Sequence, residues 1–168
     1  NKSDAELEAL KTTWGPFGMP SKDCRWMTVG YWTGTAGLDL WVADLSEWFR
    51  TGELNLVPMA IGKMGRIGGA HYDGDRMFLQ HSFDAPNGTI SMIDLSNPSF
   101  ANWKTIVPHD DNLVIQGVSY SRGIISVQYL DSAKTRIAMF DYNGKSKGDL
   151  ELPGIGSGGL STSDDRTE

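Results

Sequence analysis

Short runs of alternating apolar and polar residues recur along the chain, and glycine-rich turns separate them. Ile124–Leu130 is one such run and is rich in β-branched and aromatic side chains, and Arg76–Phe83 is a second short run, with three consecutive apolar residues and a terminal phenylalanine. Alternation with a period of two residues is typical of β-strands that bury one face. Turn sequences such as Asp73-Gly74-Asp75 and Asn143-Gly144 lie at the places where hairpins reverse. The pattern therefore predicts an all-β protein with many short strands and tight turns.

One pair of landmarks occurs three times. Three apolar runs end on an aspartate, and the aspartates lie 50 and 47 residues apart, at Asp44, Asp94 and Asp141. A proline that follows a short apolar or mixed segment comes after each one, with spacings of 50 and 45 residues, at Pro58, Pro108 and Pro153. Such self-similarity at a fixed period is the sequence signature of a repeat architecture. The simplest interpretation of each aspartate is structural: its carboxylate caps the turn that follows the strand.

Each repeat contains a strand, a turn, a second strand, a loop, a third strand that ends at the aspartate, a connection and a fourth strand that ends before the proline. Four strands in 45 to 50 residues is typical of a β-propeller blade, whereas a β-sandwich would not repeat one landmark pair. We predict an all-β fold: a β-propeller fragment with about three four-stranded antiparallel blades and partial blades at both ends. The predicted blades span residues 14–58, 67–108 and 114–153, and a further blade starts within 157–168.

Two stretches depart from the strand pattern. Ser3 and Glu6 form a capping box ahead of Leu7 and Leu10, which predicts a helix within residues 1–13. Residues 46–50 read as one helical turn that ends at Gly52, between the third and fourth strands of the first repeat.

Composition excludes several classes of function. The chain has 168 residues, 20 glycines, one cysteine and a net charge of −6. That charge gives no basic surface for nucleic acid, so nucleic acid is not expected as a partner. The longest apolar runs are too short to cross a membrane, so no membrane association is expected either. Cys24 alone can form no internal disulfide, which favours a cytoplasmic over a periplasmic location.

The number of blades points to a piece of a larger ring. Propellers close with about four to eight blades, so three blades would leave open edges. We therefore expect the isolated chain to self-associate.

The residues assemble no obvious active site, and no cofactor or metal is expected. Ser157 lies in a glycine-rich stretch, but this stretch lacks the full Gly-x-Ser-x-Gly pattern and no histidine follows it. His71 precedes Asp73 and Asp75, and two carboxylates around a glycine are typical of a tight turn rather than a metal site. Of the six tryptophans, Trp14 and Trp32 lie near strand ends and are the two that could line an exposed pocket.

Three segments together resemble the propeller of the prolyl oligopeptidases. Residues 94–98 and 102–109 are similar to their Asp-x-x-x-Pro and Trp-Lys-x-hydrophobic-Val-Pro stretch. Residues 21–26 are similar to their Ser-x-Asp-Gly-Arg-aromatic hairpin, with Cys24 in place of the usual glycine. Residues 140–145 and 152–157 are similar to the next blade, so the resemblance runs from about Trp14 to the carboxyl end. Oligopeptidase B and the dipeptidyl peptidases are related alternatives.

The resemblance implies part of a seven-bladed propeller that covers the α/β-hydrolase domain of a serine peptidase. The catalytic triad of that family lies in the hydrolase domain, so no catalytic residue is expected in this chain. The propeller would admit only short proline-containing peptides, which are cleaved after proline. The family's pocket-wall residues correspond to Gly15 or Phe17, where members carry Met, and to Thr35, where some carry Cys. The match at Thr35 requires a one-residue gap between Ala36 and Leu38.

Two hypotheses of function follow. In the first, the chain is the substrate-gating part of a prolyl-specific serine peptidase, and its partners are the hydrolase domain and short peptides. In the second, it is a non-enzymatic propeller scaffold that binds a protein or peptide. A Gly-x-Ser-x-Gly domain in the parent gene would distinguish the first hypothesis from the second.

Overall fold

The computed structural model describes residues 15–154 and 156–163. The chain divides into two compact units. The first contains the residues up to Arg66 together with Tyr72–Met77 and Ile93–Trp103. The second contains Ile67–His71, Phe78–Met92 and the residues from Lys104 onward. The helix predicted within residues 1–13 lies outside the described residues.

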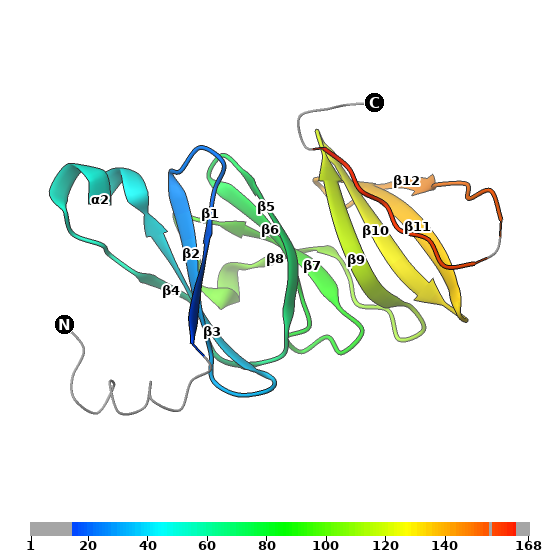
Figure 1. Ribbon diagram of the computed structural model, residues 1–168, viewed down its shortest axis with the longest axis horizontal. Helices are drawn as coiled ribbons and strands as arrows, with labels where there is room; N and C mark the ends of the chain where they lie inside the picture. The colour runs from blue at the N-terminus through cyan, green and yellow to red at the C-terminus, as the bar shows by residue number, and fades with distance from the viewer. Residues whose placement is uncertain (1–14, 155, 164–168) are drawn as a thin grey trace. The chain divides into compact units, whose positions relative to one another are not determined.

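The first sheet contains four antiparallel strands in chain order (Figure 1). These strands are β1 (Pro16–Pro20), β2 (Trp26–Trp32), β3 (Gly37–Asp44) and β4 (Val57–Met64). A short helix, α2 (Leu45–Thr51), joins β3 to β4 and ends at Gly52, whose φ of 77° closes the last turn. The helical turn predicted from the sequence at residues 46–50 is thus confirmed.

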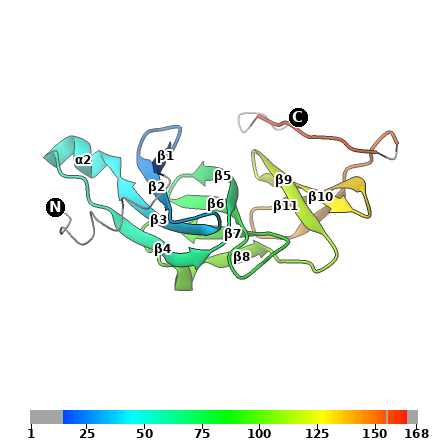
Figure 2. The same cartoon turned by 60° about the horizontal axis from the view of Figure 1, so that its bottom comes forward.

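Two further four-stranded sheets follow along the chain (Figures 1 and 2). The second sheet contains β5 (Ile67–Asp73), β6 (Arg76–His81), β7 (Thr89–Asp94) and β8 (Lys104–Val107), with the short 3-10 helix η1 (Phe100–Asn102) between its last two strands. The third contains β9 (Val114–Ser121), β10 (Ile124–Asp131), β11 (Lys134–Asp141) and β12 (Ser146–Asp149). The strands that end in the repeated aspartates are third in each sheet, as predicted.

The prolines mark the fourth strands less regularly than the sequence suggests. β8 ends directly before Pro108, but β4 begins at Val57 and continues through Pro58 to Met64. A proline is tolerated there because β4 is an edge strand, so the missing N–H need not pair with a second neighbour. The prediction that the first repeat's fourth strand ends before Pro58 is therefore wrong. β12 ends at Asp149, four residues before Pro153.

Each repeated aspartate caps the turn that follows its strand. The Oδ1 atoms of Asp44 and Asp94 accept hydrogen bonds from the backbone N–H of Ser46 and Ser96, both at 2.9 Å. Asp141 accepts from the N–H groups of Asn143 and Lys145 at 3.0 and 2.9 Å. These bonds favour the ionised form and lower the pKa of all three carboxyl groups. The largest effect comes from the serine hydroxyl at Asp44 and Asp94, and from the Lys145 N–H at Asp141.

The core of the second unit is one apolar cluster. Strands β6 to β8 and β9 to β11 both contribute to it, and its buried members are Phe78, Ile90, Ile106, Val107, Ile115, Tyr120, Ile125, Val127, Tyr129 and Ala138. In the first unit, Leu38, Leu40 and Val42 alternate along β3 and are almost fully buried. The described residues contain no helix long and apolar enough to span a membrane.

His81 is buried at the end of β6 and is held in its neutral form. Its Nδ1 accepts a hydrogen bond from the backbone N–H of Phe83 at 3.3 Å. Its Nε2 lies 2.9 Å from the hydroxyl of Ser91 on β7. Because Nδ1 is the acceptor, the ring proton of the neutral form is on Nε2 and is donated to Ser91. Burial penalises the charged form and lowers the pKa of His81 from 6.5 to about 4.

We predict that the chain loses stability as the pH falls from about 6.5 to about 4. In that window His81 is protonated in the unfolded chain but stays neutral in the folded chain. The free energy of unfolding therefore has its full value above pH 6.5 and decreases below it. The loss approaches about 3 kcal/mol at pH 4. Urea unfolding at pH 7, 6 and 5 should show it. His81→Gln should remove most of this slope between pH 7 and 5, and an unchanged slope would contradict the assignment.

Cys24 takes the backbone conformation of a glycine. It lies in the turn between β1 and β2 with a φ of 56°, and its N–H donates to the carbonyl of Ser21 at 2.9 Å. The Ser21 hydroxyl accepts the N–H of Trp26 at 2.9 Å, and Asp23 accepts the N–H of Arg25 at 3.1 Å. Cys24 thus has the left-handed backbone conformation that glycine adopts easily. Because cysteine has a Cβ, this conformation strains the backbone.

Cys24→Gly should stabilise the chain by about 0.5 to 1 kcal/mol. Glycine removes the left-handed penalty of about 1–2 kcal/mol and returns part of the gain through the larger entropy of the unfolded chain. A rise of roughly 2 °C in Tm is expected by calorimetry. Cys24→Ala is the control because it removes the thiol and keeps Cβ. An equal gain in that variant would show that the thiol, and not the backbone, is the cause.

Candidate functional site

The predicted pocket-wall residues lie at one end of the first sheet. β1 and β2 are antiparallel, and Phe17 on β1 is opposite Gly30 on β2. The amino end of β1 therefore lies beside the carboxyl end of β2, where the loop of residues 33–36 leads into β3. Gly15 and Phe17 belong to the first segment, and Thr35 belongs to the loop. The fold thus brings these residues to the same end of the sheet, and their role in a pocket stays a prediction.

The three candidates differ in what they can present to a ligand. Gly15 has a φ of 109°, a conformation that residues with a side chain rarely adopt. Phe17 is half-buried, and Thr35 is exposed. Because a methionine at position 15 would require a different backbone, Phe17 is the better candidate for a wall side chain in this segment. The loop with Thr35 is fixed at its base, since Thr33 N–H donates to the Gly37 carbonyl at 2.9 Å.

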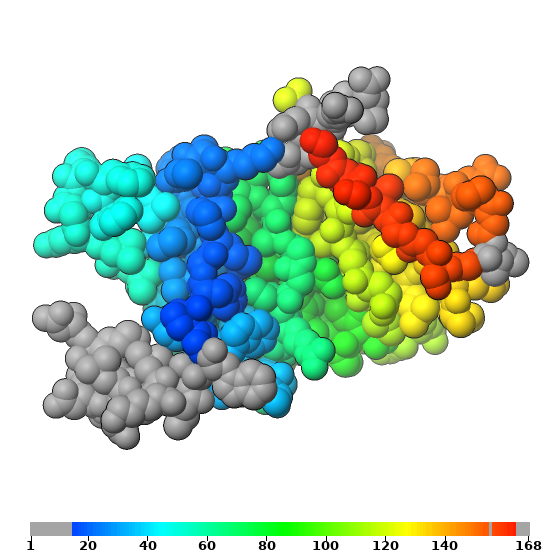
Figure 3. All heavy atoms as spheres, viewed as in Figure 1, coloured from blue at the N-terminus to red at the C-terminus, as the bar shows by residue number. Residues whose placement is uncertain are grey.

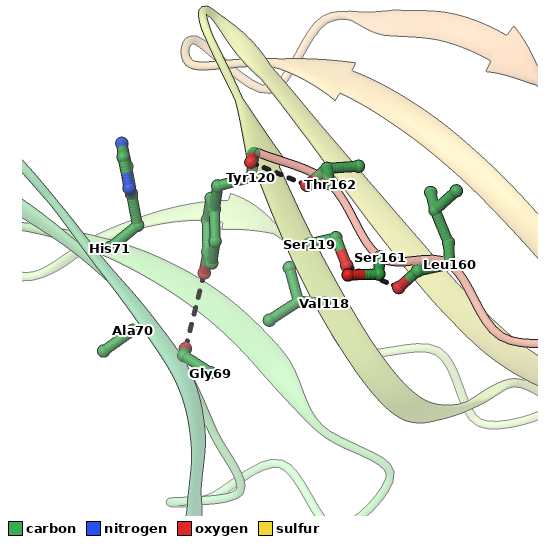
Figure 4. A pocket seen from close by; sticks show the side chains of 9 residues that line it. All are labelled: Gly69, Ala70, His71, Val118, Ser119, Tyr120, Leu160, Ser161 and Thr162. Atoms are coloured by element: carbon green, nitrogen blue, oxygen red, sulfur yellow. Dashed lines mark hydrogen bonds between the residues drawn. The ribbon is translucent and has the colours of Figure 1, made fainter. Parts of the chain in front are cut away.

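The second unit contains an open hollow of about 370 Å³ (Figure 4). β5, β9 and the segment after β12 supply its lining residues, which are Gly69, Ala70, His71, Val118, Ser119, Tyr120, Leu160, Ser161 and Thr162. The Tyr120 hydroxyl points toward β5 and lies 3.4 Å from the carbonyl of Gly69. Burial raises the pKa of Tyr120 well above its usual range, so this phenol stays protonated. The hollow offers hydroxyl groups and backbone carbonyls but no carboxylate.

His71 and Tyr120 line one side of the hollow, and Tyr142 contacts His71. The His71 ring stacks on Tyr120 with centroids 5.0 Å apart and an interplanar angle of 15°. The Tyr142 hydroxyl lies 3.1 Å from the Ser121 carbonyl and 2.9 Å from His71 Nε2. A phenol has one proton, and the carbonyl can only accept, so Tyr142 donates to Ser121. His71 Nε2 must then carry a proton and donate it to the Tyr142 oxygen. Sequence reasoning missed this contact because its partners are 71 residues apart.

Residues 156–163 form neither a strand nor a helix. Figure 3 shows this segment lying over part of the third sheet. It is bound through side chains of that sheet: Ser119 donates to the Leu160 carbonyl at 2.9 Å, and Gln128 donates to the Gly158 carbonyl at 2.8 Å. Thr162 donates in return to the Tyr120 carbonyl at 2.7 Å. The start of a further blade, predicted within residues 157–168, stays a prediction.

The close contact between His81 and Ser91 is not that of a nucleophile and its base. Ser91 is buried, and His81 Nε2 donates to its hydroxyl, whereas a general base must accept the hydroxyl proton. Ser157 is exposed and lies in residues 156–163, which form neither a strand nor a helix. A nucleophilic serine of this type needs a strand-to-helix turn, and the described residues around Ser157 do not form one.

The carboxylates next to His71 form ion pairs. Asp73 pairs with Arg76, and Asp75 pairs with Arg25 at 2.7 Å and accepts the indole N–H of Trp26 at 3.2 Å. The residues that the structure describes contain no group of three or more His, Cys, Asp or Glu side chains that could hold a metal. Both carboxylates of the Asp-Gly-Asp turn therefore have a structural use.

Asn87-Gly88-Thr89 matches the short glycosylation sequence Asn-x-Ser/Thr, and its side chains have a structural use. Asn87 Nδ2 donates to the carbonyls of Asp110 and Asp111 at 2.9 and 3.0 Å, which fixes the connection between β8 and β9. The Thr89 hydroxyl is buried and donates to the Val107 carbonyl at 2.7 Å.

Three successive four-stranded antiparallel sheets, each with a capped third strand, define a β-propeller piece. Residues 8–168 match the family described as the prolyl oligopeptidase N-terminal β-propeller domain. The chain belongs to this family. It is 26% identical to the prolyl endopeptidase of Elizabethkingia miricola over 142 residues, which are 84% of this chain and 19% of that protein. It is also 26% identical to the enzyme of Elizabethkingia meningoseptica over 135 residues, which cover 80% and 18%.

Solved structures agree with the assignment. A chain from a structural and mechanistic study of two prolyl endopeptidases matches with a TM-score of 0.74 and 25% identity, over 87% of this chain and 20% of that one. Prolyl oligopeptidase B from Galerina marginata, bound to a 35-residue substrate, matches with a TM-score of 0.76 and 18% identity, over 92% and 22%. This second likeness concerns the fold alone. The chain spans about a fifth of the length of the relatives it matches.

Tyr142→Phe should destabilise the chain by about 1 to 2 kcal/mol. The change removes the proton donated to the Ser121 carbonyl and the acceptor used by His71 Nε2, while the ring stays. Urea denaturation should show a lower midpoint with an unchanged slope. Tyr129→Phe is the matched control, since no hydrogen bond joins its hydroxyl to the described residues, and a change below about 0.5 kcal/mol is expected. Equal losses in the two variants would contradict the assigned bonds.

Proposed function

We propose that the chain is the substrate-gating propeller portion of a prolyl oligopeptidase-type serine endopeptidase that cleaves short peptides after proline. The observation that carries this proposal is the family match over residues 8–168, together with three blades of the expected order. The relatives named above are prolyl endopeptidases, and the Galerina marginata enzyme has been captured with a peptide substrate. In this proposal the chemistry belongs to an α/β-hydrolase domain elsewhere in the longer protein.

The composition of the described surface supports a gating role rather than a chemical one. Two of the three histidines are used as hydrogen-bond donors: His81 donates to Ser91, and His71 donates to Tyr142. A propeller that bounds the space above a catalytic centre would limit access by size and would contact the peptide through wall side chains. Gly15, Phe17 and Thr35 are the proposed wall residues. Truncating one such contact typically changes substrate discrimination by roughly 10- to 200-fold.

The longer protein that contains this chain should cleave a short fluorogenic peptide after proline. We expect kcat/KM on the order of 100-fold higher than for the same peptide with alanine in place of proline, because a shaped pocket discriminates by about this factor. A folded protein that displays the same sequence should resist cleavage. The 168-residue chain alone should be inactive, and Ser157→Ala in the longer protein should leave the rate unchanged.

Two results would contradict the proposal. A parent gene without a Gly-x-Ser-x-Gly domain would favour the scaffold that binds a protein or peptide. Equal cleavage of short peptides and folded proteins would leave the peptidase assignment in place and remove the gate.

A further inference from the structure

Exposed large apolar side chains gather on the outermost elements of the first sheet. The described residues contain eight large hydrophobic side chains that are exposed, and six of these lie on α2, the loop after it and β4. We call these six residues the outer strip: Trp48, Phe49, Leu54, Val57, Ile61 and Met64. Single exposed apolar residues are common on protein surfaces, whereas a run of neighbouring ones is typical of an interaction site.

The three sheets allow an internal comparison, because β4, β8 and β12 each lie at an edge of their sheet. β12 has four residues, all polar or glycine, and β8 has four residues, of which the two apolar ones are buried. β4 has eight residues and exposes three large apolar side chains, Val57, Ile61 and Met64. Short, polar edge strands protect a sheet from unwanted association. β4 differs from its two counterparts in both respects, which favours it as the edge that a partner covers.

Backbone pairing is not the contact that β4 favours. Pro58 has no N–H group, and the register of β4 against β3 shifts twice, between Leu38 and Leu40 and between Leu40 and Trp41. Such irregularities disturb the even spacing of N–H and C=O groups that a further strand would need. A partner would therefore contact the outer strip mainly through side chains. The largest of these belong to Trp48 and Phe49, whose ring centroids are 5.0 Å apart.

The charge along this surface changes sign from one end to the other. Residues 45–56 contain two glutamates and one arginine, a net charge of −1, whereas residues 57–66 contain one lysine, one arginine and no acidic residue, a net charge of +2. The charged side chains are Glu47, Arg50 and Glu53 in the first segment and Lys63 and Arg66 in the second. Asp39 on β3 lies near the second segment, where its Oδ1 accepts the Gly62 N–H at 2.6 Å, and this end stays positive with that carboxylate included. A strip that is acidic at one end and basic at the other complements a copy of itself turned by half a rotation.

We propose that the outer strip is an interface between two copies of the longer protein that contains this chain, related by a two-fold axis. In such a dimer the same surface of both copies forms the contact, so the acidic end of each strip lies beside the basic end of the other. The exposed rings of Trp48 and Phe49 are then covered. Six large side chains are fewer than an obligate interface buries, so we expect a reversible dimer with a Kd on the order of 10 µM. The inference goes beyond the proposed function and does not depend on it.

The test uses the longer protein, because the open blade faces of the 168-residue chain would give a second route to association. Sedimentation velocity at a series of concentrations should show an equilibrium between monomer and dimer. Phe49→Ser and Ile61→Ser should each raise the Kd at least about 10-fold, since a two-fold dimer uses each side chain twice. Leu130→Ser is the matched control, because Leu130 is 42% exposed on β10 outside the strip, and it should leave the Kd unchanged.

Charge reversal tests the two-fold arrangement itself. Glu53→Lys makes both ends of the strip positive, and Lys63→Glu combined with Arg66→Glu makes both ends negative, so each change should raise the Kd about 3- to 10-fold. Together, the three substitutions exchange the two ends, and the Kd should return to within about 2-fold of the wild-type value. Calorimetry of every variant shows whether it is folded, which matters most for Lys63, whose ammonium lies 4.0 Å from the centroid of the Phe100 ring.

Three outcomes decide the inference. A wild-type protein that stays monomeric at every concentration overturns it, and slow hydrogen exchange in β4 of that monomer would show that another part of the longer protein covers the strip. A dimer whose Kd none of the strip variants changes also overturns it, since the contact then lies elsewhere. Cleavage of proline peptides judges the proposed function separately: an active monomer removes only the dimer, and an inactive dimer removes only the peptidase.

Discussion

The close packing of β9 against β5 in the second unit is the contact on which the rest of that unit depends. Gly69 on β5 has no side chain at a place where a Cβ would lie 2.6 Å from Cγ1 of Val118 on β9. The missing side chain lets the two strands approach, and the Tyr120 hydroxyl then reaches the Gly69 carbonyl. His71 is stacked on Tyr120 by the same approach. Val118 and Tyr120 line the hollow at this close approach, and the stack of His71 on Tyr120 lies beside it.

Many polar side chains in the described residues hold turns and connections in place. The repeated aspartates close the turns after the third strands, Asn87 holds the connection between β8 and β9, and Asp75 binds Arg25 and Trp26. Catalytic groups need a free lone pair or a labile proton directed at a reacting atom. The side chains named above direct these hydrogen-bonding groups at turns, connections and ion pairs instead. This use of the polar residues fits a domain whose contribution to an enzyme is shape, as the proposed function requires.

The sequence predicted what local patterns control. The sequence predicts the third strands, their aspartate caps and helix α2, because alternation, turn chemistry and a terminal glycine act within a few residues. The extent of β4 was not visible, since Pro58 reads as a stop unless the strand is known to be at an edge. The contacts of Phe17 with Gly30, and of His71 with Tyr142, were also hidden because they depend on which strands pack together. Of the candidate wall residues, the sequence indicated Phe17 and Thr35 by resemblance, but only the strand register shows that they share one end of a sheet.

The turn at Cys24 has a practical consequence. Its thiol is the only one in the chain, it is exposed, and a hydrogen-bonded turn in the first unit holds its backbone. A maleimide dye or nitroxide would therefore attach at a single, rigidly anchored point without prior removal of other cysteines. Because no second thiol of this chain competes for the reagent, the label would report the environment of this one turn as the 168-residue chain unfolds in solution.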